Sequence, residues 1–177
     1  TVNLDEYCGL APDHHQSYRH FMDRHLFSKI NIDRRNTHVQ DGLAADKVTA
    51  GAEYDKMIQA MGFTDLQLLG LGENGHIGFN EPGELVAGTH EVQLTKSTIE
   101  ANARLFADIS EVPRTAITMG LWGIMTSRKV LLVACGEKKA DALRRALYGP
   151  VTAGVPASIL QLHRDLIVVC DQEAMQG

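Results

Sequence analysis

Short runs of consecutive apolar residues alternate along this chain with longer segments whose apolar residues recur at helical spacing. The clearest runs and helix-like segments are, in chain order, 46–61, 66–71, 130–135, 138–147 and 166–170. An uninterrupted apolar run is typical of a strand buried on both faces, as in parallel sheets. The alternation therefore predicts an α/β fold, a Rossmann-like three-layer domain with a mostly parallel central sheet.

Length and uniform composition both favour a single domain over residues 1–177. A chain of 177 residues can bury one sizeable core, and no repeat, low-complexity tract or linker divides it. No apolar run approaches the roughly 20 residues of a membrane span, and no signal-peptide pattern is visible. We therefore expect a cytoplasmic protein with no membrane partner.

Charge and cysteine content exclude several classes of partner and cofactor. Seventeen basic and 22 acidic residues give a net charge of −5, whereas nucleic-acid binding requires clustered lysine and arginine. A pocket for a small anion needs only two or three local cations, so an anionic substrate stays open. Cys8, Cys135 and Cys170 show neither a disulfide framework nor a zinc spacing. We expect no nucleic-acid partner, no metal and no cofactor.

Weaker signals complete the expected order of elements. Asp13 and Ser97 are candidate N-caps for helices at 14–27 and 97–106. The shorter elements expected are strands at 92–94 and 116–119 and a helix from residue 121.

A glycine-rich loop, residues 70–83, follows the apolar run at 66–71 and holds five glycines. Glycines let the backbone turn tightly and approach a ligand closely. His76 can move protons near neutral pH, and Glu81, five residues later, can hold its ring. The GLGENG stretch superficially resembles the GxGxxG dinucleotide fingerprint, but no helix clearly opens there, as that fingerprint requires. The spacing alone leaves both a catalytic loop and a plain solvated turn open.

A second motif, which is acidic, follows the first strand-like segment, residues 1–4. Asp5 and Glu6 are adjacent, so on a strand they point to opposite sides and only one can face a given pocket. Two acids at a strand end are otherwise typical of a solvated turn, which this pattern by itself favours.

Taken together, these two motifs resemble the glucosamine-6-phosphate deaminase family. The resemblance is carried by LDEYCGL and by GLGENGHIGFNEPG, whose HIGFNEP part is highly specific. It continues in the family's order through STIEANARLF, VPRTAITMG and PASILQLH, and so covers essentially the whole chain. It implies conversion of glucosamine 6-phosphate and water to fructose 6-phosphate and ammonia, in amino-sugar catabolism.

The resemblance also implies a proton-transfer set. His76 matches the group that gives and takes a proton at the ring oxygen when the sugar opens. Asp5 matches the carboxylate that carries the C2 proton to C1, and Glu81 matches the acid that orients the histidine. Asn74 stands where some members carry Asp, and a neutral Asn supplies hydrogen bonding without the charge.

For the substrate's phosphate, the resemblance implies Arg104 as a planar fork and Lys139 as a point charge. Lys138 is adjacent, so the choice between the two lysines stays open. Arg104 falls in a segment, approximately 95–120, that the family uses as a mobile lid. Without the resemblance, Arg104 would be interpreted as a solvated helix-face arginine.

Family members begin with further α/β structure, including a strand and a Gly/Ser/Thr-rich phosphate turn that has no match in these 177 residues. We therefore expect an N-terminal strand/helix unit to be missing and the chain to be a truncated form of a longer enzyme. Apolar sheet surface should then be exposed.

Three alternative functions remain open on the sequence. A 6-phosphogluconolactonase shares a GHI-type loop, although the FNEP and DEY motifs disfavour it. A deaminase of galactosamine 6-phosphate or another amino-sugar phosphate would differ by few contacts. A non-catalytic sugar-phosphate sensor would not need the proton-transfer residues. No pattern distinguishes a monomer from a homo-oligomer.

Overall fold

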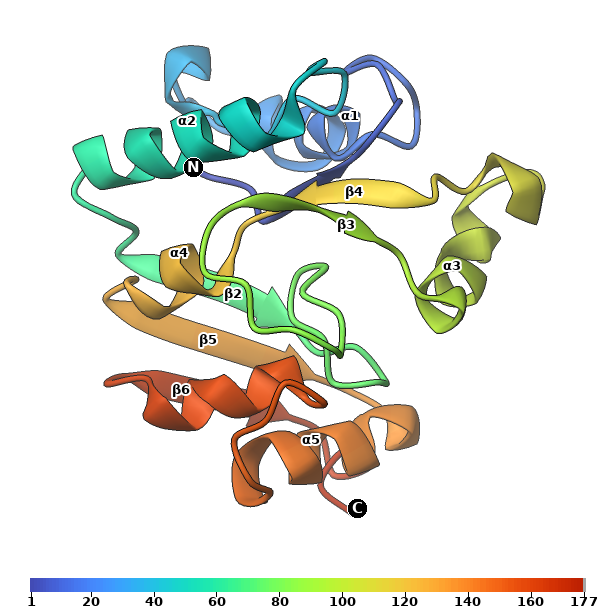
Figure 1. Ribbon diagram of the computed structural model, residues 1–177, viewed down its shortest axis with the longest axis vertical. Helices are drawn as coiled ribbons and strands as arrows, with labels where there is room; N and C mark the ends of the chain where they lie inside the picture. The colour runs from blue at the N-terminus through green and yellow to red at the C-terminus, as the bar shows by residue number, and fades with distance from the viewer. Residues whose placement is uncertain (177) are drawn as a thin grey trace.

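The computed structural model describes residues 1–176, which form two three-stranded sheets with helices packed around them (Figure 1). One sheet is parallel, which confirms the α/β class expected from the apolar runs. The other is antiparallel; two of its strands, at 90–93 and 115–118, lie within two residues of the strands expected at 92–94 and 116–119, but their antiparallel pairing was not predicted. No helix in the described part of the chain is long and apolar enough to cross a membrane.

The parallel sheet consists of β2 (Leu66–Gly70), β5 (Lys129–Ala134) and β6 (Leu166–Cys170), with β5 in the middle. Its register places Leu69 beside Leu132, both almost fully buried. Burial alternates along these strands instead of covering both faces as the apolar runs predicted. The second face therefore leaves several apolar side chains exposed: Leu66, Leu68, Ile167 and Val169.

The antiparallel sheet has the order β1 (Asp5–Tyr7), β4 (Thr115–Thr118), β3 (His90–Gln93). Strand β4 is central and pairs Thr118 with Asp5, which fixes the tip of β1. The predicted lid range of approximately 95–120 thus includes a central strand, and only its part up to residue 114 lies outside the sheet.

Helix starts follow from polar caps, as where Asp46 accepts the N–H groups of Val48 and Thr49. The α-helices are α1 (Tyr18–Met22), α2 (Lys47–Ala60), α3 (Lys96–Asn102), α4 (Leu121–Met125) and α5 (Ala140–Tyr148). A π-helix continues α1 at Asp23–Phe27. The 3-10 helices are Arg34–Asn36, Ala103–Leu105, Ile109–Glu111, Glu137–Lys139 and Pro156–Leu162.

Two of the predicted helix caps are wrong. Ser17, not Asp13, caps α1, and Asp13 lies in the turn that precedes it. Thr95, not Ser97, caps α3. In each case more than one capping residue lies near the start of the helix, and sequence cannot decide which of them the tertiary structure uses.

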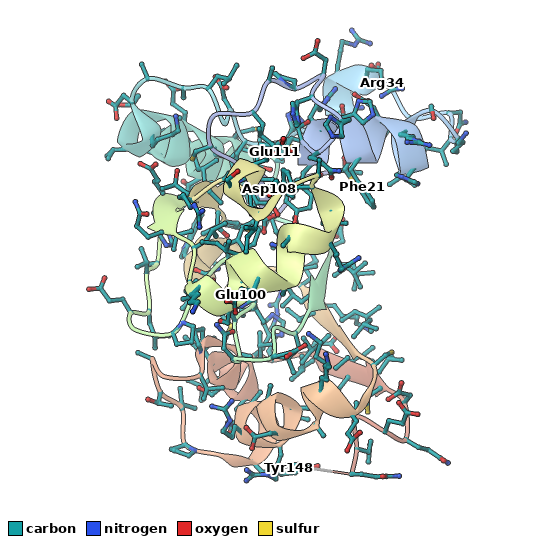
Figure 2. All side chains as sticks on the ribbon, turned by 90° about the vertical axis from the view of Figure 1, so that its right-hand side faces the viewer. Phe21, Arg34, Glu100, Asp108, Glu111 and Tyr148 are labelled. Atoms are coloured by element: carbon teal, nitrogen blue, oxygen red, sulfur yellow. The ribbon has the colours of Figure 1, made fainter. Side chains whose placement is uncertain are left out.

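The hydrophobic core has two parts. The larger part lies between the parallel sheet and helices α2, α4 and α5. The smaller part joins Tyr7 and Phe79 to Ile99 and Val112, and so attaches the segment 95–112 to β1. Figure 2 shows this segment from outside, with the exposed side chains of Glu100, Asp108 and Glu111 on it.

Candidate active site

A cavity of about 650 Å³ opens between the tip of β1, the glycine-rich loop after β2, helix α3 and the turn before α5. This volume lies within the usual range of small-molecule sites. Most of the site residues predicted from sequence lie on its wall: Asp5, Asn74, His76, Arg104, Lys138 and Lys139. Glu81 lies behind the wall, in contact with Asn74 and His76. The fold thus gathers residues that are far apart in the chain around one space.

Three positions of the glycine-rich loop require glycine, two because of their backbone conformation and one for lack of space. Gly75 and Gly78 have φ values of +93° and +57°, in the left-handed region that side chains disfavour. At Gly72 the reason is steric, because a Cβ there would lie 2.4 Å from the ring of His76. The backbone of Gly72 therefore forms the surface against which the imidazole packs.

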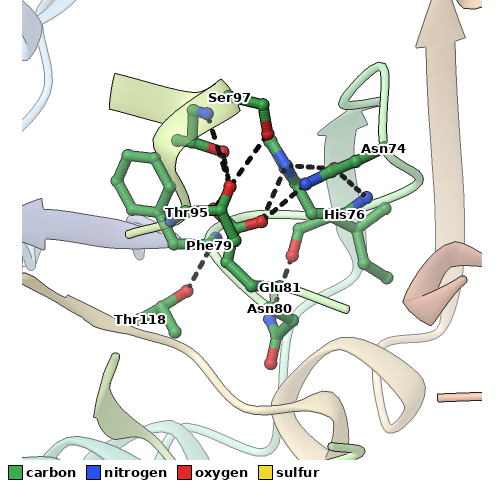
Figure 3. Close-up of polar contacts among 10 residues, drawn as sticks. Asn74, His76, Phe79, Asn80, Glu81, Thr95, Ser97 and Thr118 are labelled. Atoms are coloured by element: carbon green, nitrogen blue, oxygen red, sulfur yellow. Dashed lines mark hydrogen bonds and ion pairs between the residues drawn. The ribbon is translucent and has the colours of Figure 1, made fainter. Parts of the chain in front are cut away.

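His76 is held by Asn74 in a way that determines which ring nitrogen carries a proton (Figure 3). The backbone N–H of His76 donates to Asn74 Oδ1 at 3.1 Å, and His76 Nδ1 lies 2.7 Å from the same oxygen. Because an amide oxygen can only accept, we assign the proton of the neutral ring to Nδ1. Nε2 is then the ring nitrogen left for a ligand.

Glu81 is a buried carboxylate with several partners (Figure 3). It accepts hydrogen bonds from Asn74 Nδ2 at 2.8 Å and from the N–H and hydroxyl of Thr95 at 3.3 and 3.2 Å. His76 Nδ1 lies 3.5 Å away. Burial raises the pKa of Glu81, but the interactions with His76, Thr98 and Asn74 outweigh it and lower the pKa to about 2. Glu81 therefore stays ionised beside the imidazole.

Asp5 is also buried, with only 9% of its surface exposed. No hydrogen bond to its carboxylate comes from residues 1–176, although the backbone of the glycine-rich loop approaches it at Gly78. Burial raises the pKa of Asp5 to about 7, and the charge of Glu6 adds to the rise. A carboxyl group with a pKa near 7 can take up and release protons at neutral pH.

The structure confirms that Asp5 and Glu6 point to opposite sides, but the solvated turn that the pattern favoured is wrong. Glu6 is 2% exposed and its carboxylate accepts the N–H groups of Tyr18 and Arg19, at the start of α1. Tyr18 in turn lines the cavity. Sequence reasoning missed both residues, because only the packing of α1 against β1 brings them together.

Three cations also line the cavity: Arg104, Lys138 and Lys139. Arg104 and Lys138 are exposed, whereas Lys139 is half-buried. None of them forms an ion pair with an acid of residues 1–176. Ser97 and Thr98 at the start of α3 line the same space and add hydroxyl groups. The arrangement suits a small anion, because its positive charges are not already neutralised.

The described residues contain no group of three or more His, Cys, Asp or Glu side chains placed to hold a metal ion. The cysteines at positions 8, 135 and 170 are free thiols.

Residues 2–169 match the family described as glucosamine-6-phosphate isomerases/6-phosphogluconolactonase. A glucosamine-6-phosphate deaminase from Clostridium perfringens (strain 13 / Type A) is 55% identical over 175 residues, which are 98% of this chain and 72% of that protein. One from Lachnoclostridium phytofermentans is 58% identical over 171 residues, 96% of this chain and 72% of the relative.

Solved structures agree with these relatives. A structure described as a monomeric glucosamine-6-phosphate deaminase superposes with a TM-score of 0.95 at 43% identity, covering 98% of this chain and 73% of that one. The 6-phosphogluconolactonase of Trypanosoma brucei gives a TM-score of 0.74 at 17% identity, covering 98% of this chain and 72% of its own, and shares the fold alone.

Proposed function

The chain belongs to the glucosamine-6-phosphate isomerase/6-phosphogluconolactonase family, and on that premise we propose that it acts as a glucosamine-6-phosphate deaminase. The reaction converts glucosamine 6-phosphate and water to fructose 6-phosphate and ammonia. The observation that carries the proposal is that Asp5 and His76 line one cavity although they come from different elements. Each of them provides one kind of proton transfer that the reaction needs.

His76 serves ring opening in this proposal. A closed sugar opens when a proton leaves the anomeric hydroxyl and another reaches the ring oxygen. Because Nδ1 is taken by Asn74, Nε2 exchanges these protons with the sugar. Ionised Glu81 stabilises the imidazolium that forms when Nε2 takes up a proton.

Asp5 serves the isomerisation. Ionised Asp5 removes the proton from C2 of the open sugar, and the same carboxyl group returns it to C1, which is the neighbouring carbon. The product of this transfer is the imine of fructose 6-phosphate at C2, and water then hydrolyses the C=N bond, so that its oxygen becomes the ketone oxygen and the nitrogen leaves as ammonia. The absence of a protein partner for the Asp5 carboxylate in residues 1–176 leaves it free for this task.

The three cations bind the substrate's phosphate, and residues 95–114 act as the lid that carries Arg104. Lys139 is the stronger candidate of the two lysines, because its partial burial places it closer to the cavity interior. Anchoring the phosphate at this end of the cavity leaves the reacting carbons toward Asp5 and His76.

We predict that Arg104→Ala raises KM for glucosamine 6-phosphate tenfold or more, on the order of 1.4 kcal/mol, with a smaller effect on kcat. The physical reason is the loss of a two-pronged contact to a dianion. Steady-state kinetics measure it, with Arg144→Ala, an exposed arginine of α5, as the matched control. An unchanged KM in Arg104→Ala would remove this residue from the phosphate site.

The physiological setting is inferred from the reaction and the surface. We propose a cytoplasmic enzyme of amino-sugar catabolism that acts on a small sugar phosphate, without nucleic acid or membrane as a partner. The net charge of −5 supports the exclusion of nucleic acid.

The substrate is tested by assaying ammonia release from glucosamine, galactosamine and N-acetylglucosamine 6-phosphates, with 6-phosphogluconolactone hydrolysis measured in parallel. We expect turnover of glucosamine 6-phosphate at the highest kcat/KM. Preference for galactosamine 6-phosphate would show that the substrate is a different amino-sugar phosphate. Hydrolysis of the lactone would show that the enzyme is a lactonase instead of a deaminase. Thermal stabilisation by the sugar phosphate without any turnover would instead identify a sensor.

A further inference from the structure

Glu6 is a buried acid that the proposed chemistry does not use. Its carboxylate points away from the cavity, yet it accepts three backbone hydrogen bonds, each of 2.9 Å. Oε1 takes the N–H groups of Tyr7 and Tyr18, and Oε2 takes that of Arg19. A carboxylate that is 2% exposed is costly to desolvate, so this full set of partners explains why it is tolerated.

These contacts join two elements that meet at the cavity. The first N–H groups of a helix have no partner within the helix, and α1 satisfies them in two ways. Those of Tyr18 and Arg19 go to Glu6 on β1, whereas that of His20 goes to the local cap Ser17. Of these hydrogen bonds, those to Glu6 are the ones that join α1 to the strand that carries Asp5.

Tyr18 is the residue that this attachment places. Its ring stacks on Tyr7 with a centroid distance of 5.3 Å and lies 6.3 Å from the ring of Phe79. The other side of Tyr18 forms part of the cavity wall that also includes Asp5. A shift of the start of α1 would thus open the wall beside the carboxylate.

We propose that Glu6 is a positioning residue for the reaction, because it fixes the start of α1 to β1 and so holds Tyr18 as the wall beside Asp5. This inference rests on the proposed deaminase function for its catalytic part only. The attachment itself is a structural claim that stands without it.

Glu6 also contributes a charge next to Asp5, which provides a second readout. The groups around Asp5 are Glu6 and Tyr7 on its own strand, Tyr18 on α1, Tyr54 on α2 and His76 on the loop, and the cations of the same cavity are Arg104, Lys138 and Lys139. Of these, Glu6 is the one whose charge raises the pKa of Asp5. Its neutralisation should therefore let Asp5 ionise at lower pH.

The decisive variant is Glu6→Gln, which keeps the size, removes the charge and replaces one acceptor oxygen by NH2. We expect kcat for ammonia release to fall roughly tenfold and the acid limb of kcat/KM against pH to move to lower pH. Glu6→Asp keeps the charge on a shorter side chain. It should therefore show the same fall in kcat as Glu6→Gln, while its acid limb stays at the pH observed for the wild-type protein.

The matched control is Ser17→Ala, which weakens the same helix start but leaves the attachment to β1. It should lose stability with kcat within about twofold and an unshifted acid limb. If Glu6→Gln matches the unchanged protein in kcat and acid limb, or if Ser17→Ala shows the same losses, Glu6 has only a stabilising role and the proposal is overturned.

Amide hydrogen exchange separates failure of this inference from failure of the proposed function. Glu6→Gln should lower protection of the Arg19 amide about tenfold or more, whereas Ser17→Ala should affect His20. If the unchanged protein releases no ammonia, the proposed function fails, and the Arg19 amide alone decides the attachment. Unchanged protection of Arg19 in Glu6→Gln would disprove it.

Discussion

Two buried carboxylates at this cavity, Asp5 at the tip of β1 and Glu81 in the glycine-rich loop, have opposite surroundings. Both are less than a tenth exposed. Glu81 accepts hydrogen bonds from Asn74 and Thr95 beside His76, and its pKa falls to about 2. Asp5 has no such donors among the described residues, and its pKa rises to about 7.

This difference shows that burial alone does not determine the state of an acid. Desolvation raises the pKa of both groups, and at Glu81 the interactions with His76, Thr98 and Asn74 outweigh that rise. Environments that separate the pKa values of two neighbouring acids allow them to play different parts in one reaction. Here Glu81 is a permanent anion beside the imidazole, and Asp5 can exchange a proton at neutral pH.

The largest expected effect comes from Asp5→Asn. We predict a loss of kcat of about 10³-fold or more, because the amide cannot take the C2 proton. At pH 8 the variant should also be more stable, by an amount on the order of 4 kcal/mol, because it removes a buried charge whose pKa is raised from 3.8 to about 7. Kinetics and urea unfolding measure the two effects.

The control for this prediction is Asp65→Asn, which changes an exposed acid that pairs with Arg128. It should leave both kcat and the free energy of unfolding nearly unchanged. Full activity in Asp5→Asn would show that Asp5 is not the base, and a loss of stability would show that its charge is compensated in the folded protein.

A steric change in the loop tests the other side of the comparison. Gly72→Ala should lower kcat about 10²-fold, because the new Cβ would lie 2.4 Å from the His76 ring and displace it from Asn74 and Glu81. Gly154→Ala, where a Cβ meets only Thr152 Oγ1 at 3.8 Å, is the matched control for kinetics and stability. Normal kcat in Gly72→Ala would mean that the ring position is not critical.

A smaller effect is expected from Glu81→Gln. The amide keeps the shape but removes the charge that stabilises the imidazolium, so kcat should fall roughly tenfold, about 1.4 kcal/mol. Stability at pH 7 should fall as well, in contrast to the gain in Asp5→Asn. Glu84→Gln, an exposed acid three residues later, controls for charge. A gain of stability in Glu81→Gln would show that the buried charge of Glu81 destabilises the fold, as that of Asp5 does.

The same two regions show how far the sequence could predict this site. The loop was foreseen because HIGFNEP is specific and its glycines have local reasons, a positive φ at Gly75 and a close approach at Gly72. The bounds of strand β6 were predicted as observed, because a short continuous apolar run such as 166–170 is typical of a strand.

The surroundings of β1 could not be foreseen in the same way. Two adjacent acids, Asp5 and Glu6, locally favour a solvated turn. Their burial comes from α1 and from the glycine-rich loop, which are distant in sequence, so the local pattern could not indicate it. The antiparallel pairing of β1 with β4 spans more than a hundred residues and has no local signal. Pairings of this kind are determined by the folded core rather than by propensity.

The last expected effect is the pH dependence of the free energy of unfolding, which changes gradually with pH. The folded-state pKa of Asp5 is above its ordinary value of 3.8, so the folded protein binds more protons and stability falls as pH rises from about 4 to 7. The folded-state pKa of Glu81 is below 4.5, so its contribution is present above that pH and is lost as pH falls toward about 2.

Each group should therefore change the free energy of unfolding by up to about 1.4 kcal/mol per pH unit within its own window, with opposite signs. Urea unfolding at a series of pH values measures this, and subtraction of the Asp5→Asn and Glu81→Gln curves isolates each group from the other titrating residues. If the two difference curves slope in the same direction, the two carboxylates do not differ in the way their hydrogen-bond partners imply. Ammonia release should rise through pH 7 while stability falls, because the ionised carboxylate of Asp5 is both the active form and the destabilising one.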